Sequence, residues 1–220
     1  MLISFSHRFI FIHVYKVAGS SIRKALRRYE PLPVRLKRIA GISLKKLGLL
    51  DPEKQLNYKN YDTHITAGEL RERLPRHIYD GFFKFAFVRN PWDWQVSLYH
   101  YMLMKTTHHQ HAFIKSLGSF DRYIEWRVKE DKHLQKEFVT DADGELIVDF
   151  VGKIENLERD FEHVCRKTGI KASLPHENRS QRRDYRSYYN ERTKQLVYEH
   201  FREDVELFGY TFDNDQPAGV

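Results

Sequence analysis

The chain has 220 residues and a formal net charge of +7, with 37 Lys and Arg against 30 Asp and Glu. Its single cysteine, Cys165, excludes an intramolecular disulfide and a zinc site built on cysteines. No stretch comes near the about 18 apolar residues of a membrane-spanning helix, and the first residues lack the pattern of a secretory signal. We therefore expect a soluble cytoplasmic protein whose charge suits an anionic ligand, which leaves nucleotides, nucleic acids and membrane surfaces open.

A strand, a short loop and a helix are the first elements that the sequence predicts. Residues 9–14 (FIFIHV) are almost all apolar and β-favouring, which is typical of a strand buried on both faces of a parallel sheet. We expect His13, within this strand, to be part of the buried structure. The i, i+3, i+4, i+7 spacing of an amphipathic helix follows at Ile22, Ala25, Leu26 and Tyr29.

Residues 30–60 allow two interpretations. Pro31 and Pro33 end the helix, and the basic residues that follow lie among apolar ones. This pattern fits a basic amphipathic helix or an inserted segment. A short helix is then predicted before Pro75.

The second buried strand is predicted at residues 82–88 (FFKFAFV). Asn90 is suited to cap a helix that begins at Pro91, where the missing N–H of proline costs nothing. The apolar spacing of this helix continues to about residue 104.

The last third of the chain continues the alternation. The sequence predicts a turn at residues 141–144 (DADG), a strand at 146–154, a helix with Leu157 and Phe161 on its apolar face, a polar loop at 173–190 and a last helix capped by Asn190. Strands that alternate with helices predict an α/β fold, with a central, mostly parallel sheet flanked by helices. We expect one domain over residues 1–215 and a C-terminal tail at 216–220.

The loop of residues 15–21 (YKVAGSS) is a candidate anion site. Ligands of open α/β sheets bind beyond the carboxyl ends of the strands, and the N–H groups that open a helix can hold an anion. Lys16 adds a positive charge, Gly19 permits close approach of the backbone, and Ser20 and Ser21 add hydroxyl donors. The loop is not a Walker A loop, because Lys16 precedes the single glycine. A plain helix cap with a solvent-facing lysine fits these residues equally well.

A second candidate site follows the second strand. Arg89 leaves the end of that strand, and Ser97 lies seven residues after Asn90, which is about 700° of helix and within about 20° of two full turns. Ser97 is therefore expected on the side of the helix where Arg89 emerges, and a guanidinium with a hydroxyl is suited to a phosphate. The alternative is that Arg89 pairs with a carboxylate and that Ser97 is an ordinary helix residue.

Together these segments resemble the motifs of the sulfotransferases that use 3′-phosphoadenosine 5′-phosphosulfate (PAPS), in particular bacterial enzymes and membrane-bound carbohydrate sulfotransferases. FIHVYKVAGSSI is similar to their 5′-phosphosulfate loop, and FAFVRNPWDWQVSLYHY is similar to their 3′-phosphate motif. GKIENLERDF, LPHENRSQRRDYRSYY and EDVELFGY resemble their C-terminal third. One departure is Trp94, where many members of the family have an arginine.

The resemblance implies a sulfotransferase fold related to that of the P-loop NTPases, and a role for each site residue. Lys16 contacts the leaving phosphosulfate and stabilises charge on the bridging oxygen. The 5′-phosphate is held by Ala18, Gly19, Ser20 and Ser21, and the 3′-phosphate by Arg89 and Ser97. No metal is required, because cations of the protein neutralise the donor.

Two further residues complete the site that the resemblance implies. His64 matches the family's histidine between the two nucleotide motifs and is suited to accept the proton of a hydroxyl. A packed or surface histidine is the alternative. Arg182, in the polar loop, is expected to close over the donor or to bind an anionic acceptor. The implied reaction is transfer of a sulfuryl group to a hydroxyl, by family analogy on a carbohydrate.

Two other functions stay open from the sequence. A nucleotide kinase of the P-loop superfamily would need a Walker lysine and magnesium. A basic nucleic-acid-binding module would account for the arginines and tyrosines of residues 179–189, but it leaves the spacing of Arg89 and Ser97 unexplained. A metal is a further alternative at His108, His109 and His111, although adjacent histidines in a polar loop are more often solvated.

Overall fold

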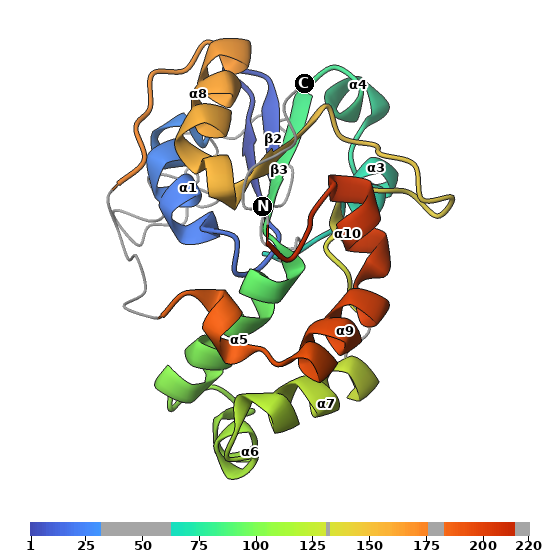
Figure 1. Ribbon diagram of the computed structural model, residues 1–220. Coiled ribbons are helices and arrows are strands. Elements are labelled where there is room, and N and C mark those ends of the chain that lie inside the picture. The colour runs from blue at the N-terminus through green and yellow to red at the C-terminus, as the bar shows by residue number, and fades with distance from the viewer. Residues whose placement is uncertain (32–62, 131–132, 176–182, 214–220) are drawn as a thin grey trace. The chain divides into compact units, whose positions relative to one another are not determined.

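The computed structural model describes residues 1–31, 63–130, 133–175 and 183–213 (Figure 1). The basic segment at 32–62, Arg182 and the predicted tail at 216–220 lie outside them. The chain forms two compact units. Unit 1 comprises Met1–Phe87, Glu137–Gly152 and Leu157–Glu177, and unit 2 comprises Val88–Lys136, Lys153–Asn156 and Asn178–Val220. The single domain over residues 1–215 stays a prediction.

The sheet has four strands in the order β1-β2-β3-β4: Leu2–Ser4, Phe9–Ile12, Phe83–Val88 and Phe150–Lys153. β2 and β3 are parallel, from Phe9 opposite Phe83 to Ile12 opposite Ala86, and β1 is antiparallel to β2. This is a mixed, mostly parallel sheet flanked by helices, so the predicted α/β class is confirmed.

Burial explains the two central strands. All of β2 is fully buried, and the rings of Phe11 and Phe85 stack across the parallel pair with centroids 5.3 Å apart. The strand predicted at residues 9–14 ends at Ile12, because the pairing with β3 ends at Ile12 opposite Ala86 and His13 no longer pairs in the sheet. β1 was not predicted. Its three residues are too few for a periodic pattern to be read.

In the described residues of unit 1 the helices are α1 (Gly19–Leu26), the short η1 (Arg27–Tyr29), α3 (Ala67–Arg73), α4 (Arg76–Tyr79) and α8 (Leu157–Thr168). α3 has a capping box between Thr66 and Glu69 and ends before Pro75, as the sequence predicts. The Tyr29 hydroxyl donates to the carbonyl oxygen of Lys171 at 2.8 Å and accepts from its N–H at 2.9 Å. These bonds tie the end of η1 to the segment after α8 (Figure 1).

The predicted turn at residues 141–144 is confirmed. Gly144 has φ 85° and donates its N–H to the carbonyl oxygen of Asp141 at 3.1 Å. Thr140 and Leu146 pair as an isolated antiparallel bridge across this turn. The strand predicted at 146–154 is therefore shorter than expected, because its first residues pair within this hairpin and β4 begins only at Phe150.

Unit 2 is mainly helical. Its helices are α5 (Pro91–Met104), α6 (His111–Ser116), α7 (Phe120–Glu130), α9 (Glu191–His200) and α10 (Arg202–Phe208), with the short η7 (Tyr185–Tyr188). α5 has the predicted bounds, and α9 packs against α5 and α7. The single last helix predicted after Asn190 is wrong. The chain leaves helical geometry at Phe201 (φ −102°, ψ 23°), whose buried ring packs edge-on against Trp94.

Candidate functional site

The loop between β2 and α1 holds two non-glycine residues in the left-handed region: Lys16 has φ 63° and Ala18 has φ 54°. Each such residue costs on the order of 1–3 kcal/mol and persists only where the surrounding structure enforces it. Left-handed residues beside helical ones also turn successive N–H groups toward one side, which is an anion-binding arrangement. The backbone of this loop is therefore suited to an anion.

α1 begins without a side-chain cap. Ala18 is the N-cap residue, and its carbonyl oxygen accepts from the N–H of Ile22 at 3.1 Å. Its methyl group cannot accept from the first N–H groups of the helix, and the first turn has no acidic residue. Lys16 is half-buried rather than solvent-facing, while Ser20 is exposed. An ordinary capped helix with a free surface lysine therefore does not describe this segment.

Gly19 is required by the ring of His13. A Cβ on Gly19 would lie 1.7 Å from Nε2 and 2.0 Å from Cδ2 of that ring, far inside any contact distance. The sequence predicts that Gly19 serves the approach of a ligand, and the structure adds that it serves packing on His13. His13 itself follows the end of β2 and is half-buried, so its predicted place inside a buried strand is wrong.

His64 lies beside His13. Its Nδ1 is 2.9 Å from the backbone carbonyl oxygen of His13, and the two ring centroids are 4.7 Å apart. A carbonyl oxygen only accepts, so Nδ1 of His64 carries the proton and donates it. In the neutral ring Nε2 is then the basic nitrogen, which is the tautomer that a general base needs.

The His13 imidazole is neutral at physiological pH. The pKa of His13 is lowered to about 3. Burial is the largest cause, and the nearby His64, Met1 amino group and Arg23 contribute in the same direction. Its Nδ1 is buried, and within the described parts of the chain no hydrogen-bonding group reaches it. His13 is therefore uncharged near pH 7.

In unit 2, Arg89 has the carboxylate partner that the sequence left as an alternative. Its Nε donates to Oδ2 of Asp93 at 2.6 Å, and its Nη2 donates to the same oxygen at 2.5 Å. The two side chains are only 14% and 15% exposed. The Arg89 backbone is held as well, because the Gln135 side chain accepts from its N–H at 2.9 Å and donates to its carbonyl oxygen at 2.8 Å.

Ser97 shares a face of α5 with Asp93, because the two residues are i, i+4 neighbours on that helix. The convergence of Arg89 and Ser97 stays a prediction. The i, i+4 spacing of Arg89 and Asp93 could have identified this ion pair from the sequence. Ser97 is half-buried.

Asn90, which follows Arg89, is held by groups distant in the sequence. Its backbone N–H donates to Oε1 of Glu155 at 2.7 Å, and its Nδ2 donates to the carbonyl oxygen of Thr211 at 2.9 Å. The Tyr210 hydroxyl donates to the other oxygen of Glu155 at 3.0 Å. Burial raises the pKa of the Glu155 carboxyl, against the lowering effect of these hydrogen bonds.

Comparison with known proteins decides the family. The chain matches the model of the Sulfotransferase family over residues 1–211. It belongs to that family. An uncharacterized protein of Archaeoglobus fulgidus is 33% identical over 113 residues, which are 50% of this chain and 87% of that protein. No solved structure matches the chain.

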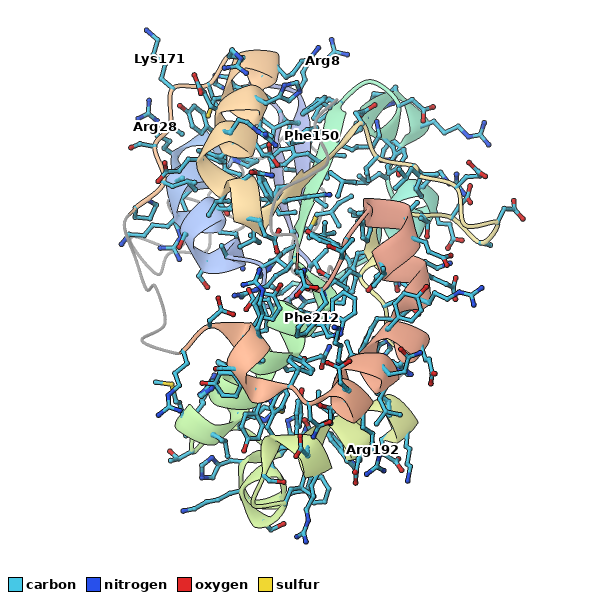
Figure 2. The ribbon with its side chains drawn as sticks, viewed as in Figure 1. Arg8, Arg28, Phe150, Lys171, Arg192 and Phe212 are labelled. Atoms are coloured by element: carbon cyan, nitrogen blue, oxygen red, sulfur yellow. The ribbon has the colours of Figure 1, made fainter. Side chains whose placement is uncertain are left out.

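The arginine- and tyrosine-rich loop of this sulfotransferase packs within unit 2 where it is described. The ring of Phe212, labelled in Figure 2, meets Trp92, Tyr185 and Tyr189 edge-on at centroid distances of 5.5–5.7 Å. Tyr189 donates to the carbonyl oxygen of Trp92 at 2.8 Å, and Arg186 pairs with Asp184. The tyrosines at 185 and 189 therefore serve packing within unit 2, whereas Arg183 is exposed.

Two other sequence features also have structural roles. Trp94, the departure from the family pattern, is fully buried, with Arg127 over its ring. Nδ1 of His111 donates to the Met102 carbonyl oxygen at 2.9 Å, and His108 stacks on His109. Within the described residues no group of three His, Cys, Asp or Glu side chains could hold a metal. None of the described helices is long and apolar enough to cross a membrane.

Proposed function

We propose that this sulfotransferase transfers a sulfuryl group from PAPS to a hydroxyl of a carbohydrate acceptor. The observation that carries the proposal is the loop that opens α1, with Lys16 and Ala18 left-handed and the first helical turn uncapped. Such a backbone suits the 5′-phosphosulfate end of the donor. The residues that would bind this end are Lys16, Ala18, Gly19, Ser20 and Ser21.

Arg89 and Ser97 would bind the 3′-phosphate, which distinguishes PAPS from ATP. Asp93 holds the guanidinium of Arg89 and Gln135 holds its backbone, and a planar guanidinium matches the geometry of a phosphate. Arg182, outside the described residues, is proposed as a further contact to the donor.

In the reaction, the acceptor oxygen forms a bond to sulfur while the bond from sulfur to the bridging oxygen of the donor breaks. The electron pair of the broken bond goes to that oxygen, where Lys16 stabilises the developing charge. Nε2 of His64 takes the proton of the acceptor hydroxyl, since its Nδ1 is committed to the His13 carbonyl oxygen. The products are the sulfate ester and 3′-phosphoadenosine 5′-phosphate (PAP).

The first test is calorimetric titration of the purified protein with PAP, with ATP and 5′-AMP alongside and no added magnesium. We expect PAP to bind at least about tenfold more tightly than 5′-AMP, since only PAP has a 3′-phosphate. Equal affinity for the two nucleotides would contradict the proposal. Affinity for ATP that needs magnesium would favour a kinase instead.

His64 and the acceptor class are tested by turnover. With ³⁵S-labelled PAPS, His64→Ala should lower kcat by about 100- to 10,000-fold and leave PAP affinity unchanged. The control is His77→Ala, an exposed histidine of α4 in the same unit. To test the acceptor class, the wild-type protein is given labelled PAPS and a panel of acceptors: neutral oligosaccharides, anionic oligosaccharides and a tyrosine peptide. Label on the tyrosine peptide alone would overturn the carbohydrate assignment and keep the donor assignment.

A further inference from the structure

The inference rests on the proposed function and concerns how its parts are held together in unit 1. The anion-binding loop is strained at Lys16 and Ala18, so some neighbouring group must enforce its conformation. Gly19, which follows Ala18, has no room for even a methyl group because the ring of His13 occupies that space. The ring of His13 is therefore in direct contact with the start of α1.

The same residue also contacts the candidate base. The His13 carbonyl oxygen accepts from Nδ1 of His64, and the rings of the two residues lie 4.7 Å apart with 37° between their planes. The ring of Phe11 lies on His13 as well, at 5.9 Å and 30°. His13 is thus packed between the loop, the candidate base and the strand, all within one unit.

His13 has none of the features of a proton-transfer group. Its imidazole is neutral near pH 7, and its Nδ1 has no hydrogen-bonding partner in the described residues. The charged groups that face it are the Met1 amino group and Arg23, besides His64, and each opposes a second positive charge there. The role of His13 is therefore steric: its flat, uncharged ring fills the space beside Gly19.

We infer that His13 is a positioning residue that fixes the anion-binding loop and His64 in one arrangement. Through its ring it sets where the first N–H groups of α1 point. Through its carbonyl oxygen and its ring it sets the tautomer and the orientation of His64. The two parts of the reaction that must be aligned, the leaving group and the base, are then both held by a single residue.

The experiment uses size exchange between His13 and Gly19. In Gly19→Ala the new methyl group meets the His13 ring, so PAP affinity should fall at least about tenfold. In the double variant His13→Ala/Gly19→Ala the ring is gone, and PAP affinity should recover by about tenfold. Turnover should not recover, because the His13 ring that packs on the ring of His64 is missing, and the backbone carbonyl oxygen at position 13 holds only Nδ1 of His64. Gly68→Ala is the matched control: it lies near the start of α3, and its Cβ would meet nothing closer than 3.9 Å.

His13→Ala alone should lower kcat by about 100-fold, the effect of roughly 1 Å of misplacement, and change the KM for PAPS much less. A packing role alone would not separate kcat from KM in this way. Should His13→Ala not fold, as seen by circular dichroism, His13→Asn keeps a short neutral side chain and is expected to show the same loss of kcat.

Unchanged kcat in a folded His13 variant would overturn the inference, and so would a folded double variant whose PAP affinity stays as low as that of Gly19→Ala. Failure of the proposed function has a different signature, because the wild-type protein would then not bind PAP at all.

Discussion

The two candidate anion sites are built by different means. The loop of unit 1 uses backbone geometry: left-handed residues, an uncapped helix start and a glycine packed on a histidine ring. The site of unit 2 uses side chains: an arginine already paired with Asp93 and held through its backbone by Gln135. The first presents partial charges whose direction is fixed, together with the charge of Lys16. The second presents a full charge, partly neutralised in advance. Substitutions in the backbone of the loop should therefore act through geometry, whereas substitutions of Lys16 and Arg89 should act through charge.

The largest expected effect separates chemistry from binding in the loop. Lys16→Ala should lower kcat about 100- to 1,000-fold, because one donor to the developing charge is lost. PAP affinity should change less than tenfold, because PAP lacks the sulfuryl group. The measurements are turnover with labelled PAPS and calorimetry with PAP, and Lys24→Ala, on the exposed side of α1, is the control. A loss confined to PAP affinity would assign Lys16 to binding alone.

The second site should respond in the opposite way. Arg89→Ala should weaken PAP binding about 100-fold, since it removes the proposed partner of the 3′-phosphate and leaves the carboxylate of Asp93 unpaired beside it. Affinity for 5′-AMP should stay the same, because that nucleotide has no 3′-phosphate. Arg202→Ala is the matched control, because Arg202 also forms an i, i+4 ion pair, with Glu206, but lies at the surface. Arg89→Ala/Asp93→Asn should recover stability without recovering PAP affinity.

Strain in the loop is tested by a smaller change. Ala18→Gly relieves a left-handed alanine, so the free energy of unfolding should rise by up to about 1 kcal/mol. Ala67→Gly, at the first residue of α3, should lower it by about 0.5–1 kcal/mol, because the glycine gains freedom only in the unfolded chain. Urea unfolding followed by circular dichroism measures both. Destabilisation by both substitutions would mean that Ala18 is not strained.

The smallest effect concerns Glu155, whose pKa burial raises. A carboxyl with a raised pKa binds more protons in the folded than in the unfolded state, so stability falls as pH rises from its ordinary range through the folded value. Glu155→Gln removes this titration and keeps an oxygen to accept from Asn90. Thermal unfolding at pH 4 and pH 7 should show a smaller loss on going to pH 7 in the variant. An equal loss in both proteins would contradict the assignment.

The sequence predicted those elements whose residues are close together along the chain. β2 and β3 are apolar runs, α5 has its cap and its proline, and the turn at residues 141–144 needs only four residues. The break at Phe201 was missed because apolar residues continue at helical spacing from Val197 to Phe208, so periodicity carries no trace of it.

The candidate site divides along the same line. Both motif segments could be located from local patterns, although the roles of their residues stay predictions. The residues that hold those segments in place could not be predicted from local patterns. Gln135 is 46 residues from Arg89, and Glu155 is 65 residues from Asn90. Gly19 and His13 are close in sequence, but their contact depends on how sharply the loop turns, which the left-handed residues Lys16 and Ala18 determine.

The side-chain amide of Gln135 makes the hydrogen bonds to Arg89 that a residue of a neighbouring strand would make. It binds both the N–H and the C=O of Arg89, as the opposite residue does in a hydrogen-bonded antiparallel pair. Strand-like hydrogen bonding therefore continues one residue past Val88, the last residue of β3. That residue is Arg89, whose guanidinium is proposed to bind the donor. The amide of Arg89 should accordingly exchange its hydrogen with solvent as slowly as the amides of β3, and Gln135→Ala should release that amide first.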